Sequence, residues 1–330
     1  MRNHILTLIV GLFLLSGCSM PSLLIKPVAN TSELEEIEVQ VARGRFGGGG
    51  GKIAIIEVEG MLINARSGAG LLGLGAEENK LSLFTQQLER AEKDSAVKAV
   101  VLRINSPGGT VTCSDTMYEL IKQFRAKTKK PVIADTQEVA ASGAYFVACG
   151  CDQIVAHPTS VIGSIGVIFE TFEVSGAMSK LGITSTAIKS GDLKDMGSPL
   201  KPLDPEARKV MQGIVDEYFA RFVDVVRENR KITDETILKT ATDGRVFSGA
   251  QALKMGLVDR NGLLSDAIDL TRQMSGASGA KVIMYKRQYG YTGSIYADTS
   301  IPPAHDNVMK LELPDSAMTR ATGFYYLWKP

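Results

Sequence analysis

Residues 139–167 read VAASGAYFVACGCDQIVAHPTSVIGSIGV, and the rest of the chain is organised around this stretch. Ser142 stands among small residues that let other backbone come close, and the apolar run at 145–151 has the length of a short buried helix. A β-branched segment follows, and a glycine turn at 163–166 ends the stretch. A serine at the first turn of a buried helix lies beside free backbone N–H groups and the positive end of the helix dipole. This position suits a nucleophile with an oxyanion site, although it also suits a serine that only caps the helix.

The sequence on both sides alternates between strand and helix patterns. Apolar, β-branched runs predict strands at 53–62, 97–104, 131–136, 153–156 and 184–189. A further strand is expected directly after residue 166, and an edge strand at 281–287. Apolar residues at helical spacing predict helices at 81–93, 114–125, 145–151, 175–181, 205–226, 248–255 and 265–274. In the longest helix, Asp204 is expected to cap the N-terminus, and apolar residues from Ala207 to Val226 share one face. This alternation predicts an α/β domain with repeated strand-helix units and a largely parallel sheet.

The N-terminal residues have the pattern of an export signal. Residues 1–17 combine Arg2, a short apolar core and small residues before Cys18. The ending Leu-Ser-Gly-Cys resembles the bacterial lipobox, in which the cysteine is lipidated and becomes the mature N-terminus. The alternatives are an ordinary signal peptide or an uncleaved anchor. We therefore expect a lipoprotein signal peptide at 1–17 and a protein anchored to a membrane through Cys18, on the periplasmic or extracytoplasmic side of a bacterial cell envelope.

The remaining chain divides into three parts. Residues 18–51 are polar and include a run of five glycines, so we expect a flexible tether. Residues 52–275 carry the strand and helix patterns and form the expected folded domain. Residues 276–330 have weaker patterns and are expected to be a C-terminal extension or arm that packs on the domain or on a neighbouring subunit.

Composition excludes several classes of function. Thirty-seven basic residues balance thirty-six acidic ones, which gives no electrostatic reason to expect nucleic-acid binding. The remaining three cysteines are Cys113, Cys149 and Cys151, and an odd number does not suit a disulfide framework. We expect all three to be small core residues. Their spacing does not resemble a zinc site, and the glycine run lacks the Gly-Lys-Ser/Thr of a phosphate loop. We expect neither a metal nor a cofactor.

A nucleophile at Ser142 requires a base, and the chain has only three histidines. His4 lies in the signal, His305 lies in the irregular C-terminal part, and the ring of His157 must fold back to reach the serine. A lysine can act as the base when it is buried enough to be neutral. Lys194 lies in a glycine-containing loop after an expected core strand, although a solvated turn lysine is the alternative because lysines are mostly exposed.

Four motifs occur together and in a specific order. They are Ser106-Pro-Gly-Gly109, Ala141-Ser-Gly-Ala-Tyr145, Gly163-Ser-Ile-Gly-Val167 and Ser190-Gly-Asp-Leu-Lys-Asp195 followed by Ser198-Pro199. This order resembles that of the bacterial signal peptide peptidase A family, in the Clp protease/crotonase superfamily, over roughly residues 52–275. The resemblance implies a Clp protease/crotonase-like fold and a lipoprotein-type variant of a family in which many members have a transmembrane anchor.

The resemblance also implies catalytic roles. Ser142 corresponds to the nucleophile, Lys194 to the general base, and Ser164 to a serine that orients the lysine. Gly109 corresponds to an oxyanion donor, with Gly143 as the second donor. A turn of two glycines exposes backbone N–H groups without side chains in the way, as a tetrahedral intermediate needs. Ala144 departs from the family pattern, in which glycine is more common there.

The expected function is hydrolysis of peptides or unfolded proteins, such as cleaved signal peptides, by a membrane-tethered homo-oligomer with a Ser/Lys dyad. One alternative is a crotonase-like enzyme in which the same glycine turn polarises an acyl-CoA thioester. Export argues against this alternative, because coenzyme A is cytosolic. A second alternative is a non-catalytic scaffold of the cell envelope, and the intact Ser/Lys pair argues against it.

Overall fold

The apolar strands that the sequence predicts form the centre of a mixed sheet. The computed structural model describes residues 34–40, 50–65, 79–230, 232–286 and 323–328. The strands of the main sheet are β1 (Glu35–Gln40), β2 (Lys52–Glu59), β3 (Val97–Ser106), β5 (Val132–Ala141), β6 (Gln153–Ala156), β7 (Val161–Gly163), β9 (Val246–Ser248), β10 (Arg260–Asn261) and β11 (Lys281–Lys286). Their order is β1-β11-β2-β3-β5-β6-β10, and β7 pairs with both β5 and β9. Neighbours from β11 to β10 are parallel, while β1 and β9 pair antiparallel with their partners.

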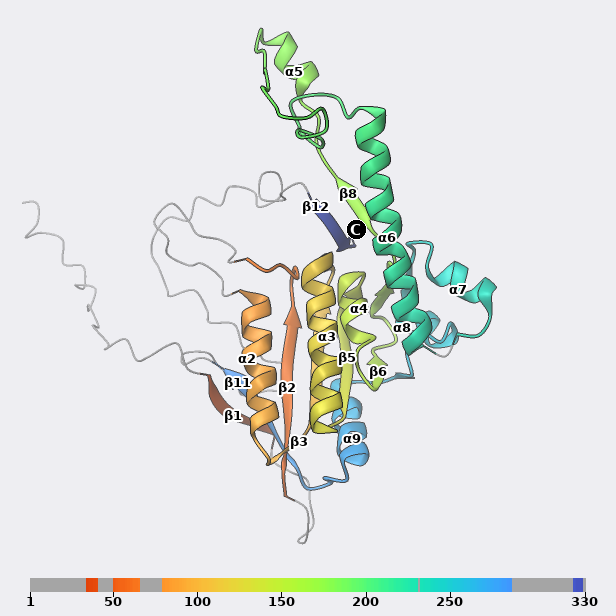
Figure 1. Ribbon diagram of the computed structural model, residues 1–330. Helices are drawn as coiled ribbons and strands as arrows, with labels where there is room; N and C mark the ends of the chain where they lie inside the picture. The colour runs from red at the N-terminus through yellow and green to blue at the C-terminus, as the bar shows by residue number, and fades with distance from the viewer. Residues whose placement is uncertain (1–33, 41–49, 66–78, 231, 287–322, 329–330) are drawn as a thin grey trace, which may run out of the picture. The chain divides into compact units, whose positions relative to one another are not determined.

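Helices cover both faces of this sheet (Figure 1). The described helices are α2 (Lys80–Lys93), α3 (Val111–Thr128), α4 (Gly143–Ala148), α5 (Ser175–Lys180), α6 (Pro205–Asn229), α7 (Glu235–Ala241), α8 (Gly249–Lys254) and α9 (Leu264–Ser275). Ile55 and Val101 pack with α9 on one face, whereas Ile56 and Leu102 belong to the larger core with α2, α3 and α4 on the other. Central strands are therefore apolar on both faces, as expected of a covered parallel sheet.

A second, smaller sheet lies beside the first. It consists of β4 (Gly108–Thr110), β12 (Gly323–Leu327) and β8 (Ile168–Glu170), in the order β4-β12-β8. Both pairings are antiparallel. This sheet joins the glycine turn after β3 to a strand from the C-terminal part of the chain.

Three sequence predictions differ from the structure. Residues 35–40, which we placed in the tether, form β1 and pair with β11. As a result β11 is an internal strand rather than an edge strand, because it lies between β1 and β2. Residues 184–189, expected to be a core strand, have no regular structure and are exposed, since no neighbouring strand receives them. The N-terminal 33 residues and residues 41–49 lie outside the described part, so the signal, Cys18 and most of the tether remain predictions.

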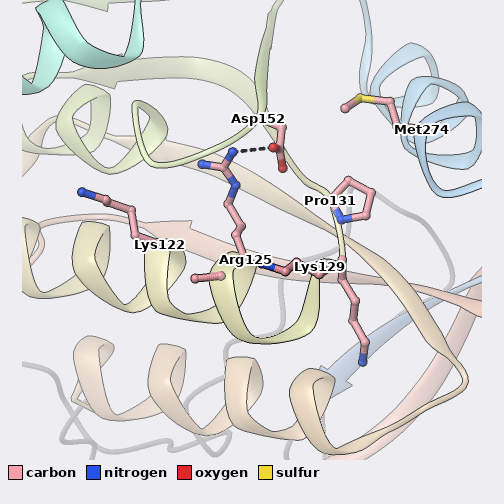
Figure 2. Close-up of a pocket in the computed structure, with 8 residues that line it drawn as sticks. Lys122, Arg125, Lys129, Pro131, Asp152 and Met274 are labelled. Atoms are coloured by element: carbon pink, nitrogen blue, oxygen red, sulfur yellow. Dashed lines mark hydrogen bonds and ion pairs between the residues drawn. The ribbon is translucent and has the colours of Figure 1, made fainter.

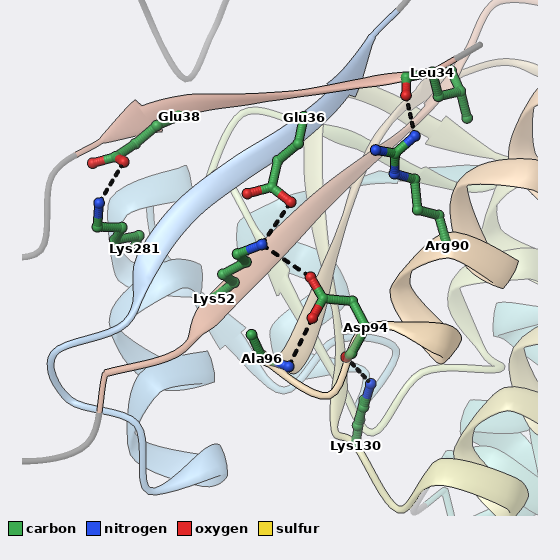
Figure 3. Close-up of polar contacts among 9 residues, drawn as sticks. All are labelled: Leu34, Glu36, Glu38, Lys52, Arg90, Asp94, Ala96, Lys130 and Lys281. Atoms are coloured by element: carbon green, nitrogen blue, oxygen red, sulfur yellow. Dashed lines mark hydrogen bonds and ion pairs between the residues drawn. The ribbon is translucent and has the colours of Figure 1, made fainter.

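Ion pairs hold β1 on the sheet. Figure 3 shows Lys52 of β2 between Glu36 and Asp94, at N–O distances of 2.7 and 3.0 Å. Lys281 of β11 pairs with Glu38 at 2.9 Å. Glu36 and Glu38 of the expected tether therefore pair with lysines of β2 and β11.

The buried cysteines and the helix caps agree with the sequence. Cys113, Cys149 and Cys151 are buried free thiols, as expected. Asp204 caps α6 by accepting from the N–H of Ala207 at 2.8 Å. Within the described ranges, no helix is both long enough and apolar enough to span a membrane.

Candidate active site

Ser142 stands between the last residue of β5 and the first residue of α4. Its backbone adopts φ 54° and ψ −119°, a conformation that non-glycine residues rarely adopt. The Ser142 N–H donates to Gly163 O at 2.7 Å, and its carbonyl accepts from Phe146 N–H at 2.9 Å. The side chain makes no capping hydrogen bond. Ser142 is therefore a buried serine in a strained turn, and the helix-cap alternative does not explain its side chain.

Ser164 occupies a similar turn next to Ser142. The parallel pairing of β5 with β7 sets Ala141 opposite Gly163, so the two serines follow paired residues. Ser164 has φ 50° and is held by a hydrogen bond of 2.8 Å from its N–H to Arg245 O. Among the described non-glycine residues only Lys129 shares a positive φ, and it ends α3 in an ordinary left-handed cap. Backbone strain thus marks the two serines that the sequence singles out.

The glycine turn after β3 is shaped by Ser106. Its hydroxyl donates to Gly60 O at 2.6 Å and accepts from Gly108 N–H at 3.1 Å. Gly108 has φ 100°, and a Cβ there would lie 2.7 Å from Gly143 N. Only glycine fits this position, because both the backbone angle and the approach of the helix exclude a side chain.

Gly109 lies beside Gly143, as expected of two donors to one oxyanion. A Cβ built on Gly143 would lie 3.1 Å from Gly109 N and would collide with the hydroxyl of Ser114. On its other side Gly109 is covered by Leu62, whose N–H donates to Gly108 O and whose carbonyl accepts from Thr110 N–H, each at 2.9 Å. Sequence reasoning did not identify Leu62 or Ser114 as neighbours of the site, because neither has a motif of its own.

The third neighbour that the sequence did not reveal is β12. In its antiparallel pairing with β4, Tyr326 is opposite Gly109 and Leu327 is opposite Gly108. The Tyr326 carbonyl oxygen lies 3.1 Å from the position of a Cβ on Gly143. A backbone carbonyl of the chain itself therefore faces the two predicted oxyanion donors.

The structure does not bring Lys194 to Ser142. Lys194 is exposed in the segment that follows α5, beside a hollow of about 830 Å³. The neighbouring Asp195 pairs with Lys201 at 2.6 Å and Lys189 at 2.9 Å, and the hydrogen bonds from these lysines lower the pKa of Asp195 to about 2. None of the ion pairs between described residues involves Lys194. Its role as the base therefore stays a prediction.

His157 is occupied away from the serine. It follows the last residue of β6, and its Nδ1 lies 2.8 Å from Thr159 Oγ1 and accepts from Thr159 N–H at 3.3 Å. Within the described part of the chain, the hydrogen bonds of its ring go to Thr159 and not to Ser142. A histidine triad thus has no support from the fold.

A second hollow, of about 480 Å³, lies at the opposite end of β5 (Figure 2). Arg125 and Asp152 form an ion pair there, and Asp152 accepts from Val132 N–H at 2.8 Å. Val132 is the first residue of β5 and Ser142 follows its last, so the two ends are roughly 30 Å apart. The contacts in this hollow connect the start of β5 to α3, and the hollow is not part of the candidate site.

The sequence is similar to those of known and provisionally named peptidases. The sequence profile of peptidase family S49 matches residues 124–297, and that of Clp proteases matches residues 60–162. A provisionally named signal peptide peptidase of Enterococcus faecium is 41% identical over 206 residues, which are 62% of this chain and 58% of that protein. A provisionally named protease of Methanocaldococcus jannaschii is 39% identical over 202 residues, 61% of this chain and 64% of that protein.

A third relative, a provisionally named protease of Synechocystis, is 36% identical over 231 residues, which are 70% of this chain and 77% of that protein. The match covers less than two thirds of the length of the first two relatives. The expected Clp protease/crotonase-like fold class is confirmed by the parallel sheet together with the Clp protease match.

Proposed function

Because this chain belongs to peptidase family S49, we propose that it is a serine endopeptidase with Ser142 as its nucleophile. The observation that carries the proposal is the strained, non-capping Ser142 beside the paired glycines Gly109 and Gly143. The hydroxyl oxygen attacks a peptide carbonyl while its proton passes to a base, and the two glycine N–H groups stabilise the resulting oxyanion. The base then returns the proton to the leaving amine, and water hydrolyses the acyl-enzyme.

Lys194 is the proposed base, and we place it in the active site of a neighbouring copy. An exposed lysine is protonated at neutral pH and cannot accept a proton, so burial is required for this role. Lys194 is exposed, whereas Ser142 is buried in its own chain. A second copy that covers the segment around Lys194 excludes water, so it buries the lysine. The same copy presents its own Ser142 to this lysine. In the proposed arrangement Ser164 helps to orient the lysine that arrives beside it.

The surface that carries Lys194 is suited to such a contact. From β8 to the start of α6, the exposed large apolar residues are Ile168, Phe172, Val174, Leu181, Ile183, Ile188 and Leu200. Ile188 is fully exposed, and Leu181 is 74% exposed. A high density of exposed large apolar residues in one segment is typical of an interface between chains.

The first half of α6 extends this surface. The apolar stripe predicted from Ala207 to Val226 is fully buried only at Ala207 and in its last two turns, at Phe222, Val225 and Val226. The apolar residues between them are partly exposed. The stripe is therefore longer than this chain alone covers, which supports a homo-oligomer.

Mixing two inactive variants tests the shared site. Ser142→Ala and Lys194→Ala are each expected to be inactive, because the pair acts as a unit. If the lysine comes from another copy, unfolding and refolding the two variants together restores activity. With random assembly of a ring, about one site in four combines an intact serine and an intact lysine. A mixture that stays inactive, although each variant assembles normally by light scattering, contradicts the shared site.

The proposed substrates are peptides or unfolded proteins of the cell envelope, including cleaved signal peptides. The anchor is Cys18, which the Leu-Ser-Gly-Cys ending marks for lipidation. Two acyl chains are needed for stable anchoring. Intact-mass spectrometry of membrane-extracted protein is expected to show lipid on Cys18, and an unmodified cysteine contradicts the anchor.

A serine-reactive fluorophosphonate tests the nucleophile directly. We expect the probe to modify Ser142, as located by peptide mapping, and to leave Ser142→Ala unlabelled. Ser114→Ala, which removes a neighbouring hydroxyl, is the matched control and is expected to remain labelled. Labelling at another serine contradicts the proposal.

A further inference from the structure

Arg245 carries an exposed positive charge whose direction is fixed by its own turn. Its Nε lies 2.9 Å from each carboxylate oxygen of Asp243, and its Nη2 lies 2.6 Å from Oδ2. The backbone N–H of Arg245 also donates to Asp243 Oδ1 at 3.1 Å. The side chain is nevertheless 56% exposed. A guanidinium has five N–H donors, so the pair with Asp243 leaves donors for a second carboxylate.

The turn that carries Arg245 lies against the turn of Ser164. The carbonyl of Arg245 accepts from Ser164 N–H at 2.8 Å, and a Cβ built on Gly163 would lie 3.0 Å from the same oxygen. The antiparallel pairing of β7 with β9 sets Gly163 opposite Val246. Arg245 therefore lies directly beside the serine at which the lysine of a neighbouring copy is proposed to arrive.

The segment around Lys194 carries a carboxylate that its own chain does not neutralise. Asp192 is exposed and lies two residues before Lys194, beside the hollow described above. Lys189 donates to the carbonyl oxygen of Asp192 at 2.8 Å, whereas its ion pair is with Asp195. The ion pairs that this segment forms with other described residues do not include the side chain of Asp192.

The positions of these two charges match. When Lys194 of one copy lies beside Ser164 of another, Asp192 arrives with it, because Cα atoms two residues apart are separated by at most about 7 Å. Arg245 is joined to Ser164 by a backbone hydrogen bond, so the long arginine side chain lies within reach of that carboxylate. Asp195 is closer to Lys194 in the sequence, but two lysines already bind its carboxylate.

We propose that Arg245 binds Asp192 of a second copy of this chain, and that this ion pair positions Lys194 of that copy at Ser164. The inference rests on the proposed function, because it requires a lysine supplied by a neighbouring copy. Arg245 is a positioning residue, since it acts through Lys194 and touches no reacting atom. Opposite charges on two docking surfaces also fix their register and exclude other arrangements.

Exchanging the two charges tests the pair. Arg245→Asp and Asp192→Arg each place like charges at the contact, so each is expected to weaken association of the full chain at least tenfold in sedimentation equilibrium. The chain with both substitutions is expected to regain the parent affinity to within threefold, because the pair is then reversed. Peptide cleavage is expected to follow the same pattern. A merely structural role of Arg245 in its own turn is not rescued by a change at Asp192.

Glu206 provides the matched control. It lines the same hollow and is exposed, but it is further from Lys194 in the sequence. Glu206→Arg is expected to change the association constant less than threefold. Equal losses in Glu206→Arg and Asp192→Arg overturn the inference, because they show a general effect of charge. A doubly substituted chain that associates no better than the weaker single variant overturns it as well.

Cross-linking of Arg245→Lys supplies an independent measurement in a variant that keeps the charge. A carbodiimide joins a lysine amine directly to a carboxylate, with loss of water. We expect peptide mapping to find position 245 linked to Asp192, and mixtures of light and heavy-nitrogen-labelled chains to show that the link joins two copies. Coupling of position 245 to Asp243 alone, in an assembled sample, overturns the inference.

The outcomes separate this inference from the proposed function. Rescue of association by charge exchange, with no cleavage in any variant including the parent, retains the ion pair and contradicts the peptidase function. Activity restored by mixing Ser142→Ala with Lys194→Ala, without rescue by charge exchange, retains the shared base and overturns the pair. A parent chain that stays monomeric overturns the pair and the shared site, while the fluorophosphonate still tests Ser142.

Discussion

Asp135 is expected to make the stability of the folded chain fall as pH rises from about 4 to 7. Its carboxyl lies in a charged row across three strands, where register sets Glu57 beside Arg103 and Arg103 beside Asp135. Burial raises the pKa of Asp135 from its ordinary value of 3.8 to about 7, although Gln137 and Arg103 act to lower it. Arg103 is already paired with Glu57, which explains why its charge does not offset the burial.

The sign and size of the change in folding stability follow from the protonation of Asp135 in the folded and unfolded states. The folded state retains the proton on Asp135 up to about pH 7, whereas the unfolded chain loses it near 3.8. The unfolded state therefore binds fewer protons in this interval, and raising the pH favours unfolding. The stabilisation is complete when the pH is below the pKa of the unfolded state, and it is lost as the pH rises through the pKa of the folded state. The difference between the two values corresponds to at most ~4 kcal/mol.

The assay compares urea unfolding of the unchanged chain and Asp135→Asn at intervals from pH 4 to pH 8. Asparagine cannot ionise, so the variant is expected to gain up to ~4 kcal/mol relative to the parent across this range. Asp94→Asn is the control, because the pKa of Asp94 is lowered below 3.8, so its difference from the parent is expected to stay nearly constant from pH 4 to pH 8. Burial raises the pKa of Asp94, but its hydrogen bonds from Lys52 and from Ala96 N–H lower it more. A parent-to-variant difference for Asp135 that stays constant from pH 4 to 8 refutes the reasoning and shows that the carboxyl is ionised throughout.

Further predictions concern the site and the anchor. Gly143→Ala is expected to lower kcat/KM by ~100-fold or more while the chain remains folded, because its Cβ would lie 3.1 Å from Gly109 N and crowd the oxyanion site; a peptide assay with circular dichroism checks both. Lys194→Ala is expected to abolish peptide cleavage and His157→Ala to retain most of it; the opposite pattern supports a histidine base. Cys18→Ala is expected to release the enzyme from membranes or to block its maturation, and fractionation by centrifugation measures which occurs.

Much of the fold can be predicted from local sequence patterns. Hydrophobic periodicity is a local property, so α2, α3, α6 and the central strands occur close to their expected positions. The prediction fails at 184–189, where an apolar, β-branched pattern finds no strand to pair with. It also fails at β1, where a polar segment becomes a strand because Lys52 and Lys281 pair with its glutamates. Strand formation depends on a partner, which the local pattern does not supply.

The sequence marked Ser142 as a candidate nucleophile, and its motifs assigned roles to Ser142, Gly109 and Gly143 through a family resemblance. Motifs of small residues can be recognised locally, because a strained turn and a close backbone approach require particular small residues at particular positions. Only the tertiary structure brings Ser164 beside Ser142, places Tyr326 against Gly109, and leaves Lys194 exposed. These relations join residues far apart in the chain through sheet pairing and burial. They depend on which surfaces meet, and no short stretch of sequence carries that information.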